Sequence, residues 1–195
     1  MTKLLQHLWA TILFSVLLLL VVAYGFHAPF LDDPERYGVA VFRFLYVLCG
    51  IMWIGLLFFV HFVLFQVLER LPAELEPSVY HYLVPEAFFW LRFAALFTVA
   101  IGLALGFLEG NLAEALLLKG DARVAGLGMW LALFMAASSW VLVWPNLKRA
   151  ANEDGVSPAR RARALWLGMI FSRINLLLSL PMLYCMVMAA ALAGG

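Results

Sequence analysis

The chain is poor in charge and in cysteine. Asp, Glu, Lys and Arg make up 13% of its 195 residues, whereas soluble domains carry about 25%. Its two cysteines, Cys49 and Cys185, each stand alone in an apolar run. This placement excludes a CxxC zinc motif, covalent haem attachment through CxxCH and a disulfide framework. We expect both thiols to pack as small hydrophobic side chains.

The chain also lacks the residue patterns of several large protein classes. It contains no Ser-His-Asp arrangement, no glycine-rich phosphate loop, no metal-ligand spacing and no pair of carboxylates within an apolar run. Its net charge of +1 gives no indication of a nucleic-acid partner. The sequence therefore offers no support for a hydrolase, a phosphate-loop enzyme or a nucleic-acid-binding protein.

Long apolar runs are abundant. Hydrophobic residues make up 66% of the chain, and about 20 apolar residues of helix cross the ~30 Å hydrocarbon layer of a bilayer. Membrane barrels alternate apolar and polar residues, a pattern that is absent here. We therefore predict an all-α integral membrane protein, a single domain over 1–195 with a bundle of about five transmembrane helices. The predicted spans are 8–26, 39–68, 87–108, 124–147 and 165–192.

The remaining segments connect these spans. The first span is longer than the apolar core of a usual signal peptide, so we interpret it as a retained anchor. We expect an acidic, partly helical connector over 69–86 and a polar link over 109–123 that contains a short surface helix. A basic loop is expected over 148–163. Gly102 and Gly106, four residues apart, should form one narrow face for helix packing.

Basic residues near the span ends predict the orientation. With the amino terminus inside and the carboxyl terminus outside, the cytoplasmic side holds Lys3, Arg70, Lys148, Arg149, Arg160, Arg161 and Arg163. The other side then holds Arg36, Lys119 and Arg123, with Arg43 just inside the membrane. We expect this arrangement in a bacterial cytoplasmic (inner) membrane.

Three arginines lie within predicted spans, where ionisable residues are functional candidates. Arg43 and Arg92 lie near helix ends and can extend to the headgroups; Arg92 can also reach Glu86. Arg173 lies about 13 Å deep if its helix enters near Ala164, two residues before Asn175. It then needs a bundle interior, a bound anion or a lipid phosphate. If the helix enters later, Arg173 is interfacial.

Two histidines are candidate haem ligands. His7 and His61 reach the same membrane face in the predicted topology, and haem b between two helices needs two imidazoles on facing sides. A haem held by this pair is an alternative hypothesis.

Four blocks of sequence resemble one known family. RFLYVLCGIMWIG (43–55), FFWLRFAALFTVAIG (88–102), VWPNLKRA (143–150) and NLLLSLPMLYCMV (175–187) resemble, in the same order, the membrane domain of PuuD-type bacterial urate hydroxylases, the urate oxidase N-terminal family. The resemblance covers the second to fifth spans in shortened form, without the cytochrome c domain of full-length members. It implies a shared scaffold formed by Arg43, Gly50, Trp53, Gly55, Trp90, Arg92, Gly102, Pro145, Asn146, Asn175 and Pro181.

The chain departs from this family at its histidines. Where the family has histidine, this sequence has Tyr46, Phe89, Gly126 and Ile174. Tyr46 is able to bind ferric haem, but the other three side chains cannot act as ligands. The resemblance thus implies the scaffold of a cofactor site without its ligands.

These observations lead to three hypotheses. The first is a non-catalytic accessory or scaffold subunit near a membrane redox or cytochrome system, in contact with the bilayer and with a cytochrome, an oxidase subunit or further copies of itself. The second is a haem b redox protein, or a urate-oxidising membrane enzyme that works with a separate cytochrome c. The third is a small anion transporter, with a polar path formed by Ser138, Ser139, Arg173 and Asn175.

Overall fold

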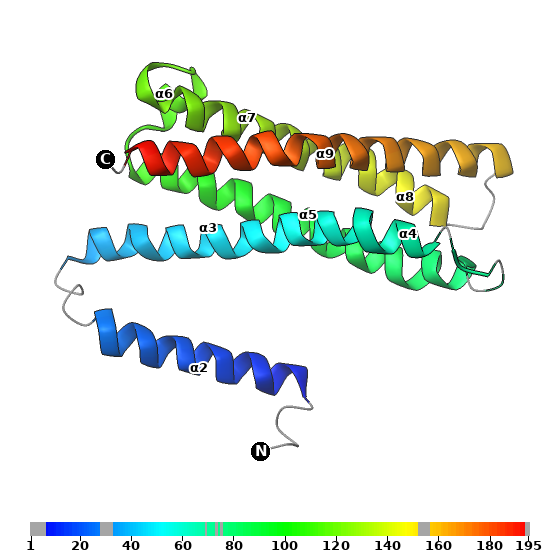
Figure 1. Ribbon diagram of the computed structural model, residues 1–195, viewed down its shortest axis with the longest axis horizontal. Coiled ribbons are helices and arrows are strands. Elements are labelled where there is room, and N and C mark those ends of the chain that lie inside the picture. Colours follow the sequence, from blue (N-terminus) through cyan, green and yellow to red (C-terminus); the bar gives the residue numbers. More distant parts are fainter. Residues whose placement is uncertain are drawn as a thin grey trace. The chain divides into compact units, whose positions relative to one another are not determined.

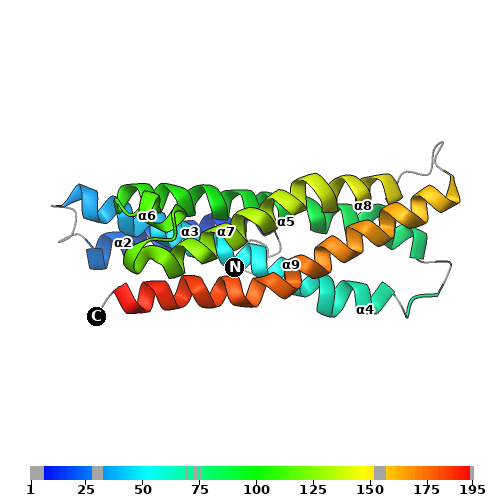
Figure 2. The same cartoon turned by 90° about the horizontal axis from the view of Figure 1, so that it is seen from above.

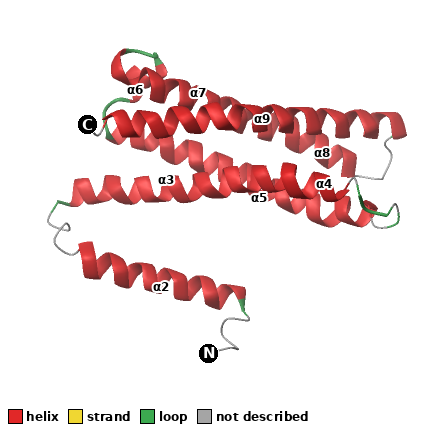
Figure 3. Ribbon diagram, viewed as in Figure 1, coloured by secondary structure: helices red, strands yellow, loops and turns green. Residues whose placement is uncertain are grey.

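The computed structural model of the chain describes residues 7–27, 33–68, 70–72, 74, 76–151 and 157–193, and all regular elements among them are helices (Figures 1 and 3). The chain divides into two compact units, Met1–Val41 and Phe42–Gly195. Each unit is described by itself below.

The first unit contains α2 (Leu8–His27) and the start of α3 (Pro34–Phe59). Helix α2 is apolar on all sides, as expected for a helix surrounded by lipid. Asp33 caps α3, because its Oδ1 accepts a hydrogen bond from the backbone N–H of Arg36 at 3.1 Å. Pro34 follows at the first helical position, where its missing N–H costs nothing.

The second unit is a bundle of long helical rods (Figure 2). The first rod is α3, continued by the π-helix η2 (Val60–Leu64) and by α4 (Phe65–Leu68). The next is α5 (Glu76–Leu108), which is followed by the short α6 (Leu112–Leu116) and the 3₁₀ turn η3 (Gly120–Ala122). The third rod joins α7 (Arg123–Ser138), the π-helix η4 (Ser139–Val143) and α8 (Trp144–Ala151), and the last is α9 (Pro158–Ala193).

Five helical stretches are long and apolar enough to cross a membrane. They are Leu8–Phe26, Pro34–Leu68, Tyr82–Leu108, Gly120–Ala150 and Pro158–Ala189. The prediction of an all-α membrane protein with about five spanning helices is confirmed, and the chain is a multi-pass membrane protein.

Three helices begin before the membrane spans predicted within them. The second helix begins at Pro34 rather than residue 39, α5 begins at Glu76 rather than 87, and α9 begins at Pro158 rather than 165. Most of the predicted acidic connector is therefore the first part of α5. Prolines cause part of this difference, because Pro34 and Pro158 stand at the first helical position and start their helices within polar sequence.

A π turn interrupts each of two rods. In η4 the N–H of Trp144 bonds to the carbonyl oxygen of Ser139, five residues back. The next residue, Pro145, has no N–H to donate. The π turn therefore lies directly before a position where an α-helix would lack one backbone hydrogen bond. Such turns are frequent at functional sites, and the two here contain His61 and Ser139.

The bundle has a basic end and an opposite end. The basic end, where α4 and α8 finish and α5 and α9 begin (right in Figure 1), carries Arg70, Lys148, Arg149, Arg160, Arg161 and Arg163. The opposite end carries Arg43, Glu109, Lys119 and Arg123. Between them lies an apolar core whose largest fully buried side chains include Trp53, Leu57, Phe88, Leu91 and Met135.

The two predicted scaffold glycines of α3 differ in their surroundings. A β-carbon at Gly50 would lie 3.9 Å from Cγ2 of Thr98, an ordinary packing contact. At Gly55 it would meet no atom within 4 Å. Gly55 instead lines a shallow apolar groove with Ile51, Met52, Leu56 and Trp90. Gly55, which the resemblance places in the scaffold, therefore has no close neighbour among the described residues.

Candidate functional site

A line of buried polar side chains runs along the inner face of α9. Ser172, Asn175 and Ser179 are all buried, and their spacing of three and four residues places them on one side of the helix. Polar groups inside a membrane bundle are stable only when they find partners. Asn175 and Ser172 connect α9 to the π turns of neighbouring rods.

Asn175 is the centre of the first connection. Its Oδ1 accepts a hydrogen bond from Oγ of Ser138 at 2.7 Å, and its Nδ2 donates to Oγ of Ser139 at 3.1 Å and to the carbonyl oxygen of Met135 at 3.3 Å. The Ser139 hydroxyl donates to the same carbonyl at 2.9 Å. The network uses the oxygen and the nitrogen of the amide and joins α9 to α7 and η4.

Three of the four residues suggested for an anion path therefore lie together. The fourth, Arg173, does not join them: it is exposed on the outer face of α9, although its neighbours Ser172 and Asn175 are buried. Of the alternatives for Arg173, the bundle interior is thus excluded. The three buried groups bond to one another, so the network as it stands is a helix-to-helix connection.

His61 forms the second connection. Its Nδ1 lies 2.8 Å from the carbonyl oxygen of Leu57, which can only accept, so Nδ1 carries the hydrogen. Its Nε2 lies 3.3 Å from Oγ of Ser172 and is left to accept from that hydroxyl. The ring is buried and meets Phe65 edge-on at 5.3 Å between centroids.

Both nitrogens of His61 are thus engaged, and haem ligation through Nε2 would require Ser172 to give up its contact. His7 is exposed and belongs to the unit that ends at Val41. The haem pair His7–His61 stays a prediction.

Arg92 lies in a box of four aromatic rings contributed by two rods. Its Cζ is 3.9 Å from the ring centroid of Trp144 and 4.8 Å from that of Trp140. The rings of Phe93 and Phe89 lie at 5.1 and 5.2 Å. The indole N–H of Trp140 also donates a hydrogen bond to the carbonyl oxygen of Arg92 at 3.1 Å. This bond holds the Trp140 ring of η4 against α5.

Of the alternatives for Arg92, the contact with Glu86 is not formed in the described structure. Glu86 is exposed, and the guanidinium faces rings rather than a carboxylate. The Nε of Arg92 is fully buried and has no hydrogen-bond partner. Among the described residues, Arg92 Nε is the one buried side-chain nitrogen or oxygen without a hydrogen-bond partner.

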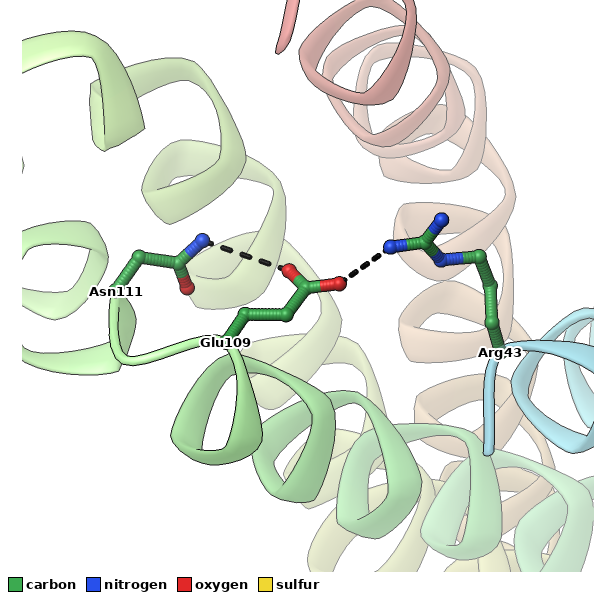
Figure 4. Close-up of polar contacts among 3 residues, drawn as sticks. All are labelled: Arg43, Glu109 and Asn111. Carbon is green, nitrogen blue, oxygen red and sulfur yellow. Dashed lines mark hydrogen bonds and ion pairs between the residues drawn. The ribbon is translucent and has the colours of Figure 1, made fainter. Parts of the chain in front are cut away.

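Arg43, in contrast, has an acidic partner (Figure 4). Its Nη2 lies 2.5 Å from Oε1 of Glu109, and the Nδ2 of Asn111 donates to Oε2 of the same carboxylate at 3.5 Å. The Arg43 side chain is 65% exposed. The sequence predicted the location of Arg43 near the membrane surface but not this ion pair.

Four residues stand where the resemblance to the urate hydroxylase family implies histidine: Tyr46, Phe89, Gly126 and Ile174. A β-carbon on Gly102 would lie 3.0 Å from the Tyr46 ring, so this ring packs against the backbone of α5. Phe89 is part of the box around Arg92, and Ile174 is half-buried on α9. At Gly126 a β-carbon would collide with the carbonyl oxygen of Ala115.

Some of these groups were missed in the sequence. Ser172 is a lone serine in an apolar helix, and its only signal is its spacing from Asn175 and Ser179 on one helix face. Trp140 and Trp144 are four residues apart, as Phe89 and Phe93 are, and such pairs beside an intramembrane arginine are a signal for an aromatic box.

Among the described residues no group of three or more His, Cys, Asp and Glu side chains is arranged to hold a metal ion. Comparison of the chain with protein-family models, with curated proteins and with solved structures finds no match. The candidate site therefore rests on its own geometry: an Asn175 network, a His61–Ser172 pair and an arginine in an aromatic box.

Proposed function

We propose that the protein is an accessory or scaffold subunit of a membrane redox or cytochrome system, built on a bundle like that of the PuuD-type urate hydroxylases and without a catalytic centre of its own. The order of the four resembling sequence blocks supports the scaffold. The observation that carries the proposal is the packing at Gly126.

The argument from Gly126 is steric. A histidine there would have to pass through the space of the Ala115 carbonyl oxygen, so the described arrangement of α6 and α7 leaves no room for a ligand at this position. Tyr46 and Phe89 are likewise engaged with Gly102 and Arg92. Gly126 and Tyr46 thus serve contacts between helices, and Phe89 packs against Arg92 within α5.

The proposed location is a bacterial cytoplasmic membrane, with the amino terminus inside and the carboxyl terminus outside. Six Lys and Arg residues gather at the basic end of the bundle, against three at the opposite end. Such an excess favours the cytoplasmic side. Labelling of single cysteines introduced at Ser157 and at Lys119 with a membrane-impermeant maleimide, in intact cells, should modify only position 119.

Two measurements decide. The first is an absorption spectrum of the purified protein, oxidised and reduced. The second compares the redox complexes of native membranes with those of membranes from cells in which the gene for this protein has been deleted. We expect a preparation without a Soret band and, after deletion, a reduced amount or activity of one redox complex. A stoichiometric Soret band that is lost in His61→Ala would overturn the proposal in favour of the haem hypothesis. Unchanged redox complexes after deletion would equally contradict it.

A further inference from the structure

We propose that the outward edge of the Arg92 guanidinium binds the phosphate of an anionic phospholipid in the leaflet at the basic end of the bundle. This inference concerns a lipid site and does not depend on the proposed redox partner. It rests on four observations: the aromatic box, the unused hydrogen-bond donors, the depth of the box and the charges beside it.

The aromatic box determines which part of Arg92 is free. The four rings cover the guanidinium through cation–π contacts, with centroids 3.9 to 5.2 Å from Cζ. Such contacts satisfy the charge but none of the N–H groups, which form their hydrogen bonds in the guanidinium plane. A ligand must therefore approach along the edge.

The hydrogen-bond donors of Arg92 have no acceptor among the described residues. A guanidinium has five N–H groups, and the structure leaves Nε buried and unpartnered. The Nη atoms are not among the buried unpartnered atoms, and the side chain is only half-buried, so the Nη end reaches the surface of the bundle. The neighbouring N–H groups of the two Nη atoms match two oxygens of a phosphate, whereas the buried Nε is out of reach of a lipid.

The depth of the box places this edge near the headgroups. Arg92 lies sixteen residues before the end of α5 at Leu108, or about 24 Å along the helix. Trp140 lies seventeen residues after the start of α7 at Arg123, or about 25 Å. If Leu108 and Arg123 mark the opposite boundary of a hydrocarbon layer of about 30 Å, both positions lie about 5 Å inside the boundary at the basic end.

The direction of the side chain closes this gap. Helical side chains lean toward the amino terminus of their helix, and α5 begins at the basic end. An arginine located a few ångströms inside the boundary extends to the headgroups in this way. The phosphate layer at the basic end is thus within reach of Arg92.

The surrounding charge favours an anionic lipid over a zwitterionic one. Lys148 and Arg149 are exposed in the last turn of α8, about one helical turn beyond Trp144 in the box. Glu86 is exposed on α5 and forms no ion pair with the described part of the chain. Within two helical turns of the box residues along the chain, Lys148 and Arg149 outnumber the single carboxylate, Glu86, so the charge next to the box attracts anionic headgroups.

The test compares lipid retention by native mass spectrometry of the full chain in detergent, with phosphatidylglycerol, phosphatidylcholine and inorganic phosphate as probes. We expect phosphatidylglycerol to be retained about tenfold better than phosphatidylcholine. Both lipids offer a phosphate to Arg92, but the choline cation of phosphatidylcholine is repelled by Lys148 and Arg149. Millimolar inorganic phosphate should leave the bound lipid in place, which identifies a lipid rather than a free anion as the ligand. Equal retention of the two lipids, or displacement by phosphate, would overturn the proposal.

Variants locate the site on the molecule. Arg92→Gln should reduce phosphatidylglycerol retention by about tenfold, whereas Arg43→Gln, at the opposite end, should leave it unchanged. A variant Arg92→Gln with a lower melting temperature but wild-type lipid retention would assign Arg92 a packing role only. If Arg92→Gln does not fold, the double variant Lys148→Gln, Arg149→Gln decides: unchanged preference for phosphatidylglycerol would refute the contribution of charge at this end.

Discussion

Gly126 of α7 lies directly against the carbonyl oxygen of Ala115 in α6, so that a β-carbon at position 126 would collide with this oxygen. The same β-carbon would lie 3.0 Å from Cδ2 of Leu118. Ala115 itself is completely buried. The short helix α6 therefore folds back onto α7 through a backbone contact that only glycine permits.

Replacing Gly126 should destabilise the protein according to the size of the new side chain. We expect Gly126→Ala to lower the free energy of unfolding by about 1–3 kcal/mol, as overpacking does, and Gly126→His to lower it further. Gly55→Ala is the matched control, because a β-carbon there meets nothing within 4 Å and should change stability by at most about 0.5 kcal/mol. Denaturation in mixed micelles, followed by circular dichroism, measures both; a stable Gly126→His variant would contradict the steric argument.

The Asn175 network should contribute to stability as a connected unit. Asn175→Leu removes the bonds to Ser138, Ser139 and the Met135 carbonyl, and we expect a loss of about 0.6–2 kcal/mol, the range found for hydrogen bonds between membrane helices. A double-mutant cycle of Asn175→Leu with Ser138→Ala should show coupling. The cycle of Ser138→Ala with Ser179→Ala should be additive, because Ser179 donates only to Leu176 of its own helix. Additivity in both cycles would refute the network.

Composition and apolar runs predicted the helices because both features are local. The five spans, the short helix over 112–116 and the free thiols of Cys49 and Cys185 follow from sequence windows of about one span or less. The first turns of α5 and α9 lie outside the apolar spans, in polar sequence of which only the connector over 69–86 was expected to be partly helical; tertiary contacts support such turns. Arg161 is an example: its Nε donates to the carbonyl oxygen of Ala150 at 2.8 Å and ties the first turn of α9 to α8.

The site was predicted only in part, because its contacts join distant parts of the chain. Asn175, Arg92 and His61 were identified as polar or ionisable groups within spans. Their partners were not, since Ser172 lies 111 residues from His61 and Trp140 lies 48 residues from Arg92. Hydrophobic periodicity indicates which helix face is buried, but not which neighbouring helix it meets.

The His61–Ser172 pair should be costly to break and less costly to remove as a whole. Ser172→Ala leaves Nε2 of a buried imidazole without a partner, and we expect a loss of about 1–3 kcal/mol in stability. His61→Phe combined with Ser172→Ala removes both polar partners and should cost less than the sum of the single changes. Equilibrium denaturation of the four proteins of this cycle measures the coupling, and a double variant as unstable as that sum would show that the contact contributes nothing.

The ion pair between Arg43 and Glu109 should be weak and sensitive to salt. Its side chains are 65% and 33% exposed, and exposed pairs contribute about 0.2–1 kcal/mol. We expect Arg43→Glu and Glu109→Arg each to lower stability, by juxtaposing like charges, and the exchanged double variant to recover most of the loss. Because salt screens exposed charges over about 10 Å at 0.1 M, the recovery should shrink at 1 M salt. An exchanged variant no more stable than the singles at low salt would mean that the orientation of Asn111 and Glu109, rather than charge, decides the contact.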